Sequence, residues 1–174
     1  MKNMLFIAIA LMLSTTVFGD EPDNSQAVAK RAEVLKTNRK SFQLALAYDG
    51  QSDKPYYSLL LSVPTVNVKR SSPFALVTQI DDVQALKIIA HLADTGILGR
   101  ASEKGDKTKP AQSGYQLFIT ADTLQLTAPL GWDREMLKTL DGIKKVLDGD
   151  AAKDMDTLLG RLSGHRKQWD AAAK

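Results

Sequence analysis

Cysteine is absent from this chain of 174 residues. Without a thiol there is no disulfide framework, no zinc–thiolate site, no cysteine nucleophile and no lipid-modified cysteine behind an export signal. The fold must therefore be stabilised by an ordinary core of apolar side chains.

An excess of one charge is also missing. The chain has 23 Lys and Arg residues against 20 Asp and Glu residues, a formal net charge of +3. Proteins that bind nucleic acid usually have a larger and clustered basic excess. The charge balance therefore indicates no nucleic-acid partner.

Imidazole, the side chain best suited to metal binding and acid–base catalysis at neutral pH, occurs only twice, at His91 and His165. These residues fall in different predicted helices and form no i, i+4 pair, so we predict no metal site and no cofactor. His91 lies between Lys87 and Asp94 on a polar helix face, where we expect solvent to surround it. Gln84 is predicted to lie on the same polar face. His165 belongs to a basic stretch at a helix end, where the helix dipole favours a cation.

Motifs of covalent and phosphate chemistry are missing too. The chain has no Gly-x-Ser-x-Gly nucleophile elbow and neither of the common glycine-rich phosphate loops. The acidic run that begins at Asp148 fails as a calcium loop, because Lys153 replaces the required glycine and Leu159 replaces the bidentate glutamate. We therefore predict no catalytic residue, and a protein without enzymatic activity is the favoured interpretation.

What the chain does contain is a typical export signal in residues 1–19. Lys2 is followed by the apolar run of residues 5–13, and residues 17–19 suit a signal peptidase. The run is too short to cross a bilayer, which takes about 20 residues as a helix. We predict a cleaved signal peptide, a mature chain with no transmembrane span that starts at Asp20, and a location in the periplasm or outside the cell.

The mature chain, residues 20–174, has the length of a single domain, and its pattern indicates an α+β fold. Apolar and polar residues alternate in two pairs of segments, each of which predicts an antiparallel hairpin, and two further short strands are expected. The hairpins comprise residues 42–48 with 57–63 and residues 115–120 with 124–127; the short strands comprise residues 66–69 and 74–79. We expect an antiparallel sheet of two hairpins plus the short strands.

About three helices should pack on this sheet. Asp81 or Asp82 is placed to cap a helix with a wide apolar arc that includes Val83 and Ala90, and Gly96 is placed to end it in a left-handed conformation. Two more helices are expected after Asp133 and Asp150. Their apolar stripes comprise Met136 or Leu137, Leu140, Ile143 and Leu147 in the first helix, and Met155, Leu158, Leu159, Leu162 and Trp169 in the second. Residues 20–40 are predicted to form a weak helix or a loose arm, and residues 99–114 a long surface loop.

Two surfaces are candidate binding sites. Tyr56 and Leu60 lie on the second, half-polar face of the first hairpin; we expect a helix to cover this face, and the alternative is an open face available to a partner. At the carboxyl-terminal end, Arg166 and Lys167 lie close to Trp169, where the alternatives are a solvated helix end and a site for an anionic partner.

The carboxyl-terminal part resembles one group of proteins. The segments Gly131-Trp132, Leu140-Asp141-Gly142 and residues 145–149, together with residues 155–169, are similar to a stretch of uncharacterised exported bacterial proteins. This resemblance implies export and a single domain, and it implies no activity, ligand or catalytic residue.

Taken together, the sequence predicts an exported soluble protein that serves as a non-catalytic binding or interaction module of the cell envelope. Its partner would be a protein or another envelope component. Two alternatives stay open at this point: a small cell-envelope hydrolase or an inhibitor of an envelope enzyme, and a structural homo-oligomeric envelope protein.

Overall fold

The computed structural model describes residues 24–49, 58–66, 75–103, 114–131 and 134–172. The predicted signal peptide lies outside these ranges. In the part of the chain that is described, no helix is long and apolar enough to cross a membrane.

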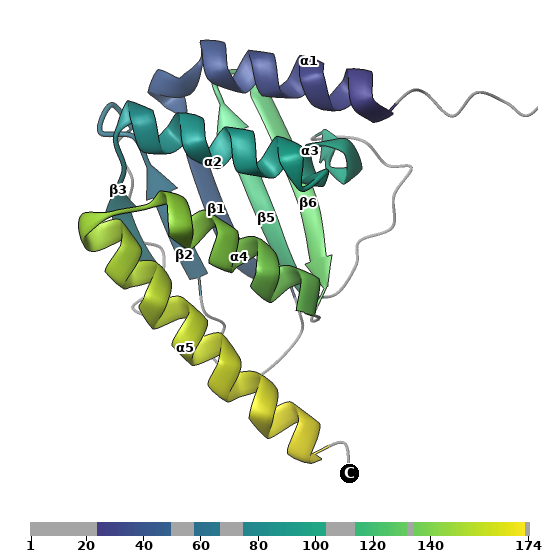
Figure 1. Cartoon of the computed structure of the whole chain (residues 1–174), viewed down its shortest axis with the longest axis vertical. Coiled ribbons are helices and arrows are strands. Elements are labelled where there is room, and N and C mark those ends of the chain that lie inside the picture. The colour runs from purple at the N-terminus through teal and green to yellow at the C-terminus, as the bar shows by residue number, and fades with distance from the viewer. Residues whose placement is uncertain (1–23, 50–57, 67–74, 104–113, 132–133, 173–174) are drawn as a thin grey trace, which may run out of the picture.

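The architecture has two layers, a mixed six-stranded sheet and a layer of helices on one of its faces (Figure 1). The sheet has the order β3-β2-β1-β5-β6-β4. Its strands are β1 (Gln43–Asp49), β2 (Ser58–Ser62), β3 (Ala75–Gln79), β4 (Ser102–Glu103), β5 (Gly114–Ala121) and β6 (Leu124–Gly131). The helices are α1 (Asn24–Thr37), α2 (Asp82–Asp94), α3 (Ile97–Arg100), α4 (Arg134–Val146) and α5 (Gly149–Ala172), with a 3₁₀ turn at Arg39–Ser41.

The α+β class is confirmed, and both predicted hairpins are present as the antiparallel pairs β1–β2 and β5–β6. The wholly antiparallel sheet is wrong, because β3 pairs with β2 in parallel. The helices also number five among the described residues, where about three were predicted. Sequence patterning indicates that a segment is a strand, but the direction of its pairing depends on how the chain crosses the sheet.

Residues 20–40 contain a packed helix, so the loose-arm alternative is wrong for the described part. Ala32 and Leu35 of α1 are buried, at 6% and 0% exposure. Arg31 donates hydrogen bonds from Nη1 to the carbonyl oxygens of Leu98 (2.6 Å) and Ala101 (3.0 Å), at the carboxyl-terminal end of α3. A guanidinium in this position satisfies carbonyls that the short helix leaves without an intrahelical partner. It also joins α1 to the segment predicted to be a loop.

The predicted amino-terminal cap of α2 is present, and of the two candidates Asp81 is the capping residue and Asp82 the first residue of the helix. The Asp81 carboxylate accepts a hydrogen bond from the Gln84 backbone amide, and the Gln84 side chain accepts one from the Asp81 amide, which completes a capping box. This contact holds Gln84 in a buried position, whereas the predicted arc had placed it on the polar face. Val83, predicted to be buried, is instead 58% exposed. Gly96 has the predicted left-handed conformation, with φ of 70°.

The helix layer has the order α1, α2, α4, α5, in which each helix contacts the next. Alternate residues of every long strand point into this layer and form the core. They are buried aliphatic side chains: Leu44, Leu46, Leu59, Leu61, Leu117, Ile119, Leu126 and Ala128. Met136, Leu140, Ile143, Met155, Leu158 and Leu162 meet them from α4 and α5 as predicted.

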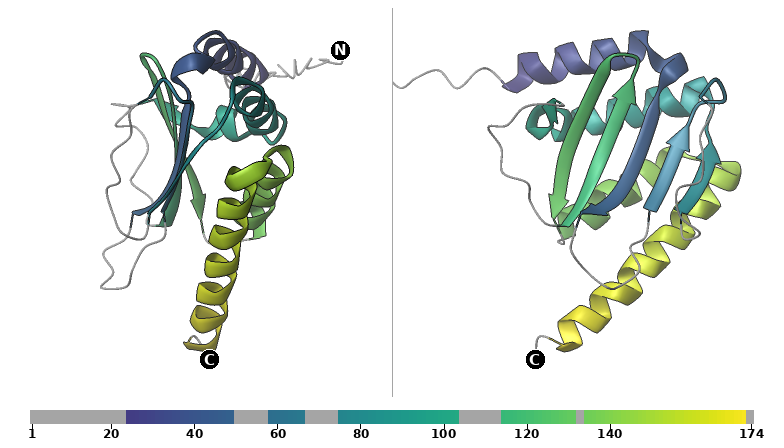
Figure 2. Two further views of the ribbon diagram at one scale, coloured as in Figure 1. Left: turned by 90° about the vertical axis from the view of Figure 1, so that its left-hand side faces the viewer. Right: turned by 180° about the vertical axis from the view of Figure 1, so that it is seen from behind.

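We call this side of the sheet the helix-covered face. Figure 2 shows that the described helices all lie on this side. The expectation that a helix covers the other face of the first hairpin is therefore wrong for the described residues. The same views show that α5 extends well past the end of the strands.

Candidate functional site

The structure describes the side chain of one of the five residues that the sequence singled out for binding. Leu60 is in the middle of β2 and is half-buried. Tyr56 lies outside the described residues. Arg166, Lys167 and Trp169 belong to α5, which continues as a helix to Ala172, but their side chains are not described.

Leu60 belongs to a row of side chains that crosses the sheet on the face opposite the helices. The register pairs Leu60 with Val77 of β3 and with Ala45 of β1, and Ala45 in turn with Phe118 of β5. Phe118 is 38% exposed. Because successive side chains of a strand point to opposite faces, this row is a continuous apolar strip on what we call the helix-free face.

The helix-free face carries no charged side chain at its described positions, although charged residues make up 25% of the chain. Along β1, the residues of this face are Gln43, Ala45, Ala47 and Asp49. Asp49 is the one charged residue among them, and its side chain is not described. The face consists of small, amide, hydroxyl and apolar side chains: Gln43, Ala45, Ala47, Leu60, Ser62, Val77, Gln79, Ser102, Gln116, Phe118, Thr120, Gln125, Thr127 and Pro129.

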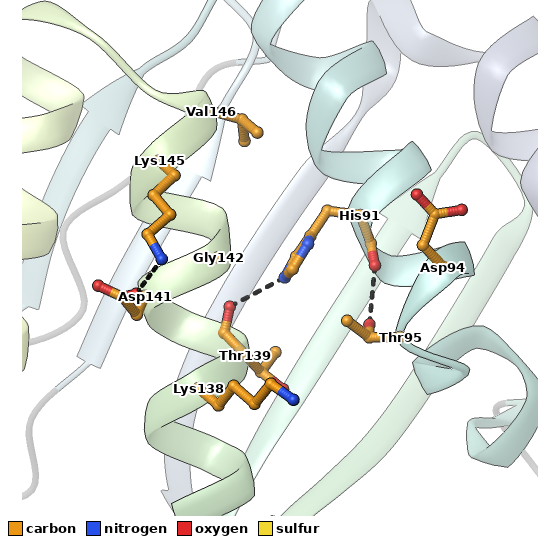
Figure 3. A pocket seen from close by; sticks show the side chains of 9 residues that line it. All are labelled: His91, Asp94, Thr95, Lys138, Thr139, Asp141, Gly142, Lys145 and Val146. Atoms are coloured by element: carbon orange, nitrogen blue, oxygen red, sulfur yellow. Dashed lines mark hydrogen bonds and ion pairs between the residues drawn. The ribbon is translucent and has the colours of Figure 1, made fainter.

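A second candidate site is a cleft between α2 and α4 with a volume of about 550 Å³ (Figure 3). We call it the α2–α4 cleft. Its lining combines an imidazole, two hydroxyls and both signs of charge, and comprises His91, Asp94, Thr95, Lys138, Thr139, Asp141, Gly142, Lys145 and Val146.

His91 occupies the middle of the α2–α4 cleft, so the expectation that solvent surrounds it is wrong. Its Nε2 lies 3.2 Å from the carbonyl oxygen of Thr139 on α4. A carbonyl accepts and does not donate, so Nε2 of His91 carries a proton. The imidazole lies against the backbone of α4 at Gly142, where an added Cβ would stand 2.1 Å from His91 Cε1. Only glycine allows this approach.

The charges of the α2–α4 cleft are partly paired. The Lys145 ammonium lies 2.8 Å from the Asp141 carboxylate, and its hydrogen bond lowers the pKa of Asp141 below the ordinary value of 3.8. Both residues belong to α4. Lys138 and Asp94 have no ion-pair or hydrogen-bond partner for their charged groups among the described residues. One cation on α4 and one anion on α2 thus line the cleft without a partner in the described part of the chain.

Two catalytic arrangements are absent from the described part of the α2–α4 cleft. Among the described residues, no group of three or more His, Asp or Glu side chains is arranged to hold a metal ion. The Thr95 hydroxyl donates to the carbonyl of His91 in its own helix at 2.7 Å, and so lacks the contact with an imidazole that would activate a nucleophile. A more open hollow of about 590 Å³ lies beside α1 and is lined mainly by residues of that helix.

In comparisons with known proteins, no family model, no curated protein and no solved structure matched the chain. The resemblance to uncharacterised exported bacterial proteins therefore stays a prediction, and the function has to be argued from the geometry of this chain.

Sequence reasoning missed the α2–α4 cleft. Lys138, Thr139 and Gly142 were read as part of one amphipathic helix, and His91 as a surface residue of another. One signal was present: Gly142 interrupts the apolar pattern of α4, and an isolated glycine inside a helix often marks a close contact. The sequence alone does not say which residue makes that contact.

Proposed function

We propose that this protein is an exported, non-catalytic binding module of the cell envelope, which binds a protein partner through the helix-free face of its sheet. One observation carries the proposal. The helix-free face has no charged side chain at its described positions and has an apolar strip at its centre, in which Phe118 is 38% exposed.

An uncharged face of this size suits an interface. Solvent-facing sides of sheets commonly carry polar and charged residues, whereas the centres of protein interfaces are depleted of charge and enriched in aromatic residues. Phe118 supplies an aromatic group and Leu60 an apolar group two strands away in the same row. Ser62 and Gln116 of this face are buried, but the exposed amides of Gln79 and Gln125 give a partner hydrogen-bonding groups at the rim.

Export is the second part of the proposal, and it is supported by residues 1–19. The expected mature amino terminus is Asp20. The intact mass of the protein recovered from an exporting host tests this, because retention of residues 1–19 in a membrane-extracted form would mean an uncleaved anchor.

Photo-crosslinking tests the binding surface directly. A photoreactive phenylalanine analogue is placed at position 118 in cells that export the protein, and the control variant carries it at position 83. Val83 is the more exposed of the two residues, at 58%, and it is on α2, away from the helix-free face. We expect a discrete protein adduct from position 118 and none from position 83.

A variant of the apolar strip completes the test. Leu60→Gln in the chain labelled at position 118 should reduce the adduct, because it places a polar group in the middle of the strip. An adduct with twice the mass of the mature chain would support the homo-oligomeric alternative. Equal adducts from positions 118 and 83, or none from position 118, would contradict the proposal.

A further inference from the structure

The α2–α4 cleft also contains the hydroxyl of Thr139. This residue is 3% exposed and lines the cleft, and its hydroxyl has no hydrogen-bond partner within the described ranges. In a site that is open to solvent, this group is available to a ligand.

The two walls of the cleft offer opposite hydrogen-bonding roles. On the α2 side, the groups that face a ligand are acceptors: the Asp94 carboxylate and the oxygen lone pairs of Thr95, whose proton is used within α2. On the α4 side they are donors: the Lys138 ammonium and the Thr139 hydroxyl. The remaining charges on that wall, Lys145 and Asp141, neutralise each other.

We propose that the α2–α4 cleft binds a small zwitterion of the amino-acid type. Its ammonium group lies toward Asp94 on α2, and its carboxylate lies toward Lys138 and Thr139 on α4. This site does not involve the helix-free face, so an experiment that contradicts one of the two proposals leaves the other unaffected.

The dimensions agree with a ligand of this class. The cleft has a volume of about 550 Å³, within the range of roughly 300–1,000 Å³ that is typical of small-molecule sites. A ligand that carried only one sign of charge would meet one matching and one opposing charge, since Lys138 and Asp94 lie on opposite walls (Figure 3). A zwitterion matches both.

Chemical-shift mapping tests the site. Free L-amino acids are added one at a time, at millimolar concentration, to the isotope-labelled mature protein at neutral pH. We expect at least one of them to shift the backbone amides of residues 91–95 and 138–142. For the amino acid that binds best, the N-acetyl derivative lacks the positive charge and the methyl ester lacks the negative charge. Each should bind about tenfold more weakly or worse.

Variants locate the two contacts. Lys138→Gln and Thr139→Val should each weaken binding of the same amino acid by about tenfold, and so should Asp94→Asn. The matched controls are Lys153→Gln on α5 and Asp122→Asn in the β5–β6 turn, which make the same charge changes outside the cleft. The amide spectrum of each variant checks that the fold is retained.

Three results would overturn this inference. The first is the absence of any shift in the cleft with every amino acid tested. The second is binding of the N-acetyl derivative and the methyl ester as tight as that of the parent amino acid. The third is equal weakening by the cleft variants and by their controls.

Discussion

Two neighbouring leucines on β2 show how different the two faces of this sheet are. Leu61 points into the helix layer and is 0% exposed. Leu60 points the other way and is half-buried in the apolar strip of the helix-free face. The same strand thus contributes one residue to the core and the next to a surface, because successive side chains alternate between faces.

The composition of each face agrees with this division. The helix-covered face is mainly aliphatic, and Tyr115 and Thr78 are also buried on it. The helix-free face is uncharged at its described positions but mixed, with Gln, Ser and Thr around the apolar strip. Stability should therefore reside on one side of the sheet and binding on the other, and this division is testable.

The largest expected effect comes from comparing the two leucines directly. Leu61→Ala should lower the free energy of unfolding by about 2–5 kcal/mol, because it leaves a cavity under the helices. Leu60→Ala should cost only about 1 kcal/mol. Urea denaturation of both variants checks this, and equal losses would show that the helix-free face also belongs to the core.

The packing of α5 provides the next test. Leu158 is 0% exposed, whereas Leu159 next to it is only partly buried. Leu158→Ala should cost about 2–4 kcal/mol, toward the lower part of the usual range since α5 lies at one side of the layer, and Leu159→Ala should cost clearly less. An unchanged melting temperature for Leu158→Ala would mean that α5 is peripheral to the fold.

The contact between α2 and α4 gives a smaller effect with a specific rescue. Gly142→Ala should destabilise the fold by about 1–3 kcal/mol, because the new Cβ would overlap the His91 ring. Adding His91→Ala to the same chain should restore most of that loss. The control is Gly160→Ala in α5, where a Cβ meets no atom within 4 Å and should stabilise the helix by about 0.5–1 kcal/mol. A Gly142→Ala variant as stable as the wild type would contradict the close approach of the two helices.

Arg31 tests the attachment of α1 to α3. Arg31→Met keeps much of the apolar stem and removes the hydrogen bonds to Leu98 and Ala101, so it should cost about 1–2 kcal/mol. Arg31→Lys keeps the charge without the planar guanidinium and should recover only part of this loss. Full recovery with lysine would indicate that charge alone, and not the pair of carbonyl contacts, is what matters.

The smallest effect concerns the exposed pair of Asp141 and Lys145. The hydrogen bond from Lys145 lowers the pKa of Asp141 in the folded chain, so the contribution of this carboxylate is present above its ordinary pKa of 3.8 and is lost as the pH falls through the lowered value. In Lys145→Gln, the titration midpoint of Asp141, followed by NMR, should move to higher pH. An unchanged midpoint would show that the pair does not persist in solution.

The stripe of α4, Met136, Leu140 and Ile143, was predictable from its spacing, and so were the hairpins and the Asp81 cap. These features depend on residues close in sequence, whose geometry the helical and strand periods dictate. Gln84 and Val83 were assigned to the wrong sides because a capping box overrode hydrophobicity in the first turn of α2.

The parallel pairing of β3 and the position of His91 could not be predicted in this way. Both depend on contacts between separate elements. The strand β3 pairs with β2 at the edge of the sheet, and the His91 ring of α2 lies against Gly142 of α4. A periodic pattern indicates which side of a helix is apolar, but it does not indicate which polar residue will contact a glycine of another helix.

By itself, the sequence determined the α+β class, the two hairpins and the residues that form most of the core, because each follows from local periodicity and capping. Tertiary structure alone decided which face of the sheet the helices cover, and it brought His91, Asp94, Lys138 and Thr139 into one cleft. Those arrangements depend on how separate elements bury their apolar sides against one another, and this packing has no signature within any single segment.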